Sequence, residues 1–117
     1  MAHPLRTALL LALGLALLAC ASAQDRAWSY YTDGLEAAEA GRWDDSRRDY
    51  EASLATGYAA YGVHADYAVA LARIGRYEEA EVQLAEEARL YPQSAALVAH
   101  VREFIRQAQA AGKGDAP

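Results

Sequence analysis

Residues 41–46 read GRWDDS and residues 75–80 read GRYEEA, so the same order of residue types returns with Gly41 and Gly75 34 residues apart. Glycine ends a helix easily because it adopts the left-handed conformation without a Cβ penalty. The paired acids that follow are favoured in the first turn of a helix, where the backbone dipole is positive. The stretch therefore predicts a corner between two helices, and the chain makes this corner twice.

The remaining residues of the two corners fit packing better than catalysis. Trp43 and Tyr77 place a large ring where it can cover the apolar gap between two helices. Ser46 and Ala80 are small enough for two helix backbones to approach closely. Adjacent acids on a helix point in different directions, so they are better explained by helix-start charge than as an acid–base pair.

The chain after residue 25 has the pattern of an all-α fold. Ala, Leu, Glu and Arg dominate it, and no stretch alternates apolar and polar residues as a strand does. Short connections between neighbouring helices favour antiparallel hairpins. The glycines and Pro92 divide the chain into five predicted helices, over residues 26–40, 43–56, 63–74, 77–91 and 94–111.

The first 23 residues are predicted to be a signal peptide. Residues 8–19 form an apolar run that follows Arg6, and the run has signal-peptide length, whereas a membrane span needs about 20 residues. Two processing sites overlap at its end. Residues 21–23 read ASA, a small-x-small cleavage site before Gln24, whereas residues 17–20 read LLAC, which resembles the lipobox of bacterial lipoproteins. In the second alternative Cys20 is lipidated and Leu18 departs from the usual smaller residue.

Composition limits the function classes. Cys20 is the only cysteine, so no intramolecular disulfide can form. The chain has 11 Lys and Arg against 16 Asp and Glu, a net charge of −5, which argues against nucleic acid or an anionic membrane surface as a partner. The sequence has no phosphate-binding loop, no HExxH and no cysteine cluster. We therefore predict no enzyme activity, no catalytic residue and no cofactor.

One pair of side chains has the spacing of metal ligands. His100 and Glu103 fall on one face of a predicted helix, one turn apart. No third ligand accompanies them, and a protein zinc site uses at least three. We therefore expect a surface pair and no metal site.

The 34-residue period resembles that of the tetratricopeptide repeat (TPR) family. Two sets of positions match the family pattern: Tyr30, Gly34, Gly41, Trp43, Ser46, Tyr50 and Leu54 in the first copy, and Tyr67, Ala68, Leu71, Gly75, Tyr77, Ala80, Leu84 and Pro92 in the second. The departures are Asp33, Tyr58, His64 and Glu87. The resemblance implies repeats over about residues 27–60 and 61–94, a capping helix over 95–111 and a disordered polar tail over 112–117.

A second resemblance concerns the cellular location. Residues 64–71, HADYAVAL, and residues 86–98, EEARLYPQSAALV, resemble the C-terminal half of a family of small exported bacterial lipoproteins. Together with the signal peptide, this resemblance implies a protein of the periplasm, anchored to the outer membrane if Cys20 is lipidated.

In TPR proteins the first helix of each repeat lines a concave groove that binds a protein partner. Carried over by position, the resemblance places seven residues in this groove: Trp28, Tyr31, Leu35, Ala65, Asp66, Val69 and Arg73. For the three from the first repeat a second interpretation stays open, because the same helical spacing is typical of a buried core stripe.

The predicted function is therefore a protein–protein interaction module, a TPR adaptor or scaffold of the bacterial cell envelope. The alternative is a structural accessory lipoprotein that packs permanently in an envelope or secretion assembly. Stacks of this kind usually need about three repeats to bury a continuous core. Because the chain has about two, we also expect that the first helix is covered by another chain, in a homodimer or in an envelope complex.

Overall fold

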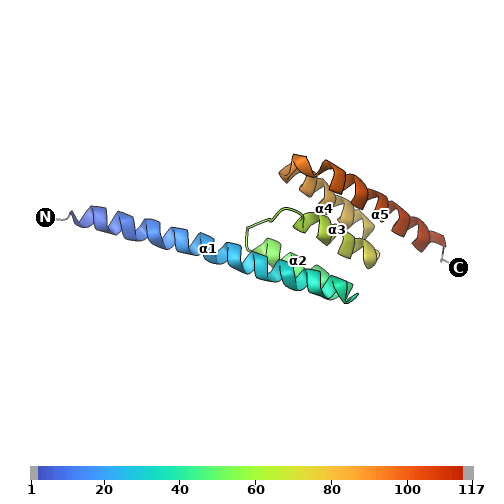
Figure 1. Cartoon of the computed structure of the whole chain (residues 1–117), viewed down its shortest axis with the longest axis horizontal. Helices are drawn as coiled ribbons and strands as arrows, with labels where there is room; N and C mark the ends of the chain where they lie inside the picture. The colour runs from blue at the N-terminus through green and yellow to red at the C-terminus, as the bar shows by residue number, and fades with distance from the viewer. Residues whose placement is uncertain (1–2, 115–117) are drawn as a thin grey trace.

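The computed structural model describes residues 3–114, apart from the side chains of residues 19–21 and 113–114. Within that range the chain is helical and contains no strand. Figure 1 shows the five helices, which are α1 (Pro4–Glu39), α2 (Trp43–Ala55), α3 (Val63–Arg73), α4 (Tyr77–Leu90) and α5 (Ala95–Gly114), with a 3-10 turn, η1 (Pro92–Ser94), before α5. The all-α class and the five helices are confirmed, and α2, α3 and α4 begin at the predicted residues.

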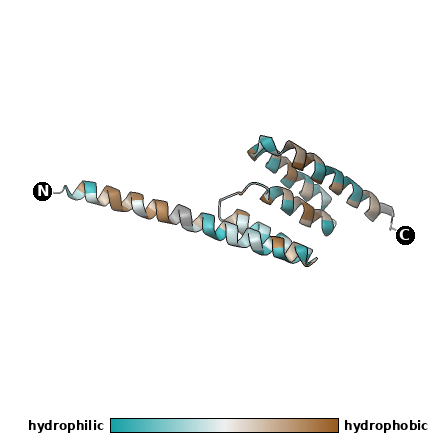
Figure 2. Ribbon diagram, viewed as in Figure 1, coloured by the Kyte–Doolittle hydropathy of each residue, from teal (hydrophilic) through white to brown (hydrophobic). Residues whose placement is uncertain are grey.

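The first helix is much longer than predicted. α1 has 36 residues and begins at Pro4, whereas a start at residue 26 was expected. The physical reason is that Ala and Leu have high helix propensity and that no proline follows Pro4 until Pro92. In Figures 1 and 2 its apolar first half projects away from the other helices, and the molecule measures 80 × 28 × 18 Å. All the leucines of this half are exposed, including Leu5 at 77%.

By length and composition, α1 could cross a membrane, a property that it shares with signal sequences near an N-terminus. Its helical conformation fits a removed and a retained segment equally, so cleavage near residue 23 stays a prediction. The side chain of Cys20 lies outside the described part of the chain.

The two repeated stretches are helix corners, as predicted. Gly41 and Gly75 have φ of 74° and 82°, in the left-handed region. In the first corner the Arg42 amide donates to the Ala37 carbonyl at 2.9 Å, and the Arg76 amide donates to the Leu71 carbonyl at the same distance in the second. These are the backbone bonds of a Schellman ending. The acid pairs lie in the first turns of α2 and α4.

Small residues bring α1 and α2 into close contact. The buried Ser46 hydroxyl donates to the Gly34 carbonyl at 2.8 Å, and the buried Ser53 hydroxyl donates to the Ala27 carbonyl at 2.7 Å. A Cβ atom at Gly34 would lie 2.5 Å from the Tyr50 ring. The predicted role of Ser46 as a spacer is confirmed, and its hydroxyl adds a bond between the two helices.

The second hairpin and α5 contain most of the apolar core. α3 packs against α2, α4 and α5, and α5 also packs against α4. The Tyr77 hydroxyl of the second corner donates to the Ala108 carbonyl of α5 at 3.2 Å. The larger buried apolar residues of this part are Val63, Leu71, Leu84, Val98, Val101 and Ile105. α5 continues to Gly114, so the disordered tail predicted from residue 112 is corrected for residues 112–114, and residues 115–117 lie outside the described range.

Candidate protein-binding groove

A solvent-open cleft of about 350 Å³ lies between the first helices of the two hairpins. We call it the α1–α3 groove, and its walls are formed by Leu35, Ala38, Glu39, Trp43, Tyr50, Asp66 and Val69. Leucine, valine and the two rings make most of this surface apolar. The groove therefore offers an apolar wall with a few carboxyl groups.

Three of the seven residues predicted to line a groove do so in the structure. Leu35, Asp66 and Val69 line the α1–α3 groove. Tyr31 and Ala65 are buried, with exposed fractions of 8% and 1%, so they belong to the core and offer no open surface.

The other two predicted residues lie elsewhere. Trp28 is 58% exposed and lines a different hollow together with Tyr58 and Tyr61. Arg73 is exposed at the last turn of α3. The stripe Trp28, Tyr31 and Leu35 is therefore neither wholly groove nor wholly core.

Asp66 is held by a buried tyrosine. The Tyr31 hydroxyl on α1 donates to Asp66 Oδ2 on α3 at 2.5 Å. Burial raises the pKa of the Asp66 carboxyl, the hydrogen bond from Tyr31 lowers it in part, and the nearby charge of Glu87 raises it. The pKa of Tyr31 is also raised, by burial first and then by its bond to Asp66. Asp66 is thus an oriented carboxyl group that is poorly solvated at one wall of the groove.

Glu87 is a fully buried acid behind this wall. Its exposed fraction is 0%, and its Oε1 accepts a 2.8 Å hydrogen bond from the Gly62 amide. Gly62 is the N-cap residue of α3 and has no side chain to cap the helix, so Glu87 of α4 supplies the carboxylate at the positive end of α3. Its Oε2 has no hydrogen-bond partner among the described residues.

Sequence reasoning missed the role of Glu87. The available signal was that Glu87 departs from the TPR pattern that the sequence resembles. It follows Leu84 by one turn and so falls on the buried face of a helix, where an unpaired charge is costly.

Arg73 is positioned by two aromatic rings. Its guanidinium carbon lies 5.1 Å from the centre of the Trp43 ring and 4.8 Å from that of Phe104. Both distances are within the range of a cation–π contact. Trp43 also lines the groove, so Arg73 lies beside the groove without being one of its lining residues. The corner residue Trp43 and Phe104 of α5 thus both contact Arg73 of α3.

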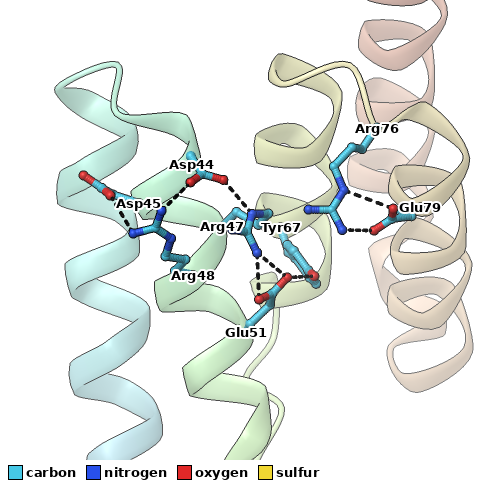
Figure 3. A network of polar contacts seen from close by, with 8 residues as sticks. All are labelled: Asp44, Asp45, Arg47, Arg48, Glu51, Tyr67, Arg76 and Glu79. Carbon is cyan, nitrogen blue, oxygen red and sulfur yellow. Dashed lines mark hydrogen bonds and ion pairs between the residues drawn. The ribbon is translucent and has the colours of Figure 1, made fainter.

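A second polar cluster joins α2 to α3. Figure 3 shows the Glu51 carboxylate between Arg47 of α2 and Tyr67 of α3. Arg47 donates to Glu51 and to Asp44 at 2.9 Å, and the Tyr67 hydroxyl donates to Glu51 at 2.6 Å. Burial would raise the pKa of Glu51, but the bonds from Tyr67 and Arg47 outweigh it and the pKa is lowered. The carboxylates of Asp44 and Glu51 are therefore hydrogen-bonded within the fold, which indicates a structural role.

The His100 and Glu103 pair is not assembled as a metal site. Glu103 accepts hydrogen bonds from Arg106 at 2.6 Å and from Gln107 at 3.0 Å. The bond from Arg106, followed by that from Gln107, lowers the pKa of Glu103 to about 2. Among the residues that the structure describes, no group of three or more His, Cys, Asp or Glu is placed to hold a metal ion.

Comparison of the chain with protein-family models, with curated proteins and with solved structures finds no match.

Proposed function

We propose that the protein is an exported interaction module of TPR type, in which a segment of a protein partner docks in the α1–α3 groove. The observation that carries this proposal is the open apolar groove between the first helices of two hairpins that share a 34-residue period. In helical repeat proteins such a surface is where partners bind. The two hairpins would be repeats, and α5 would be the capping helix.

The size and chemistry of the groove favour side chains of a protein segment. At about 350 Å³ it is at the lower end of small-molecule sites, and it is open to solvent. Leu35 and Val69 are only partly buried, so a docked apolar side chain would remove their remaining surface from water. Burial of apolar surface contributes roughly 25 cal/mol per Å². A partner segment that inserts one or two side chains would fit.

A second candidate function is supported by the aromatic hollow. Trp28, Tyr58 and Tyr61 are exposed together at one end of the hairpins. Exposed aromatic groups of this kind are typical of surfaces that another protein covers. The alternative is therefore an accessory lipoprotein that packs permanently in an envelope assembly, or a homodimer that covers this hollow.

Photo-crosslinking distinguishes the two functions. A benzophenone amino acid at Val69 lies in the groove, and the same residue at Val82, which is 65% exposed on α4 and outside the groove lining, is the matched control. The adaptor function predicts a discrete crosslinked partner from Val69 and none from Val82. Crosslinks from Trp28 with none from Val69 would instead support the accessory function.

The envelope location has its own test. Cells that express the wild-type chain and Cys20→Ser are labelled with palmitate, and the N-terminus of the mature protein is determined. Lipidation predicts label in the wild type alone, whereas the ASA site predicts no label and an N-terminus at Gln24.

A further inference from the structure

The groove carries an unneutralised acid at one end of an apolar wall. Asp66 lines the groove, and its Oδ2 already accepts the bond from Tyr31. Among the described residues Asp66 has no ion-pair partner and no further hydrogen-bond donor, so Oδ1 keeps its acceptor capacity. Asp66 Oδ1 is therefore available to accept a hydrogen bond from a donor group of another molecule.

The local charges favour a cation as that donor. Glu87 lies buried behind Asp66 and contributes a further negative charge, which acts on Asp66 through space. A carboxylate that has lost part of its hydration gains most from a positively charged donor, because charge-assisted hydrogen bonds are about twice as strong as neutral ones. The acidic balance of the whole chain, −5, also favours a basic partner.

Arg73, the basic residue that was predicted to line the groove, is held away from Asp66. Arg73 is seven residues after Asp66 on α3, about 10 Å along the helix axis. Its guanidinium is stacked between Trp43 and Phe104. A second acid, Glu39, the last residue of α1, also lines the groove. Among the described residues neither of these two groove acids forms an ion pair, and Asp66 is the less exposed of the two.

We propose that the groove recognises a basic and apolar segment of a partner protein, in which a Lys or Arg binds Asp66 and an apolar side chain packs on Leu35 and Val69. This inference rests on the proposed function and names the chemistry of its partner. Tyr31 acts as a positioning residue, because its hydroxyl orients the carboxyl group that the cation meets.

The test uses the protein in the form that expressing cells process, with a library of displayed random peptides as the probe. Peptides are selected on the wild type, and those that no longer bind Val69→Arg are kept as groove ligands. We expect these ligands to be enriched in Lys or Arg beside apolar residues. Asp66→Asn preserves an acceptor for Tyr31 and removes the charge, and it should weaken such peptides about tenfold. Glu103→Gln, an exposed acid of α5, is the control and should leave affinity unchanged.

A double-mutant cycle separates charge recognition from a general structural effect. The selected basic residue of the peptide is replaced by norleucine, and its loss of affinity is measured with the wild type and with Asp66→Asn. The inference predicts a large loss with the wild type and almost none with the variant. Tyr31→Phe retains the charge without its orienting donor and should weaken basic peptides more than their norleucine analogues, so it tests the inference if Asp66→Asn does not fold.

Several outcomes would overturn the inference in different ways. Equal losses in the two arms of the cycle, or Val69-dependent ligands without basic residues, would reject the partner chemistry and leave the proposed function standing. The absence of any Val69-dependent ligand would reject both. Self-association that Asp66→Asn abolishes in light scattering would assign the groove to a second copy of this chain and reject a partner segment.

Discussion

The Tyr31 hydroxyl of α1 and the Asp66 carboxyl of α3 are joined by a hydrogen bond of 2.5 Å between the two hairpins. The bond links a core residue to a groove residue, since Tyr31 is buried and Asp66 lines the open groove. It fixes the direction of a groove acid that no basic residue of the described chain neutralises. Both the stability of the fold and the chemistry of the groove therefore depend on Tyr31 and Asp66.

Asp66→Asn is expected to stabilise the protein near neutral pH by about 1 kcal/mol, because it removes a poorly solvated charge and keeps an acceptor for Tyr31. Because the folded state raises the pKa of Asp66 above its ordinary 3.8, the folded state takes up the proton first. The penalty is present above the raised pKa and is relieved as pH falls through it. Thermal unfolding of both proteins across this range should show a gap that closes on acidification, and a constant gap would contradict it.

Glu87→Ala should destabilise the fold by about 1–3 kcal/mol, because it leaves the buried Gly62 amide at the start of α3 without a partner. Glu86→Ala is the matched control. Glu86 is the neighbouring residue and pairs with Arg89 on the surface, so its loss should leave the free energy of unfolding nearly unchanged. Urea unfolding of the two variants measures the difference, and equal effects would rule out the capping role of Glu87.

Gly34→Ala should destabilise the first hairpin although alanine is the better helix former. The new methyl group would lie 2.5 Å from the Tyr50 ring, which is itself buried against α1. We expect a cost of about 2 kcal/mol from overpacking. In a Tyr50→Ala background the same change should become neutral or stabilising. If the cost persists in that background, contact with Tyr50 is not its cause.

Trp28→Asp and Tyr31→Asp should differ sharply although the residues are neighbours on α1. Trp28 is 58% exposed, so the aspartate is hydrated and cooperative unfolding is retained. Tyr31 packs beside Tyr50 with ring centres 5.9 Å apart, and an aspartate there would face Asp66 as a buried like charge. Circular dichroism and thermal unfolding should show a folded first variant and a largely unfolded second one. Two folded variants would show that Tyr31 is not part of the core.

Local chemistry was sufficient to predict most helix boundaries. The conformation of Gly41 depends only on its missing side chain, and the acids after it respond to a helix dipole that acts within one turn. The small side chains of Ser46 and Ala80 likewise predicted buried positions between helices, and both residues are fully buried. The same local chemistry also explains the one large difference, since the propensity that makes residues 26–39 helical continues back to Pro4 without a break.

The sequence by itself thus determined an all-helical chain with two matching corners, because capping and helical periodicity are encoded within a few residues. Only the tertiary structure decided which residue of the stripe Trp28, Tyr31 and Leu35 is buried by neighbouring helices. Tyr31 is buried by α2 and α3 while Trp28 on the same helix stays exposed, and helical spacing alone does not name the neighbour. It also decided the role of Glu87, because the amide that this acid caps comes from the start of another helix, 25 residues earlier in the chain.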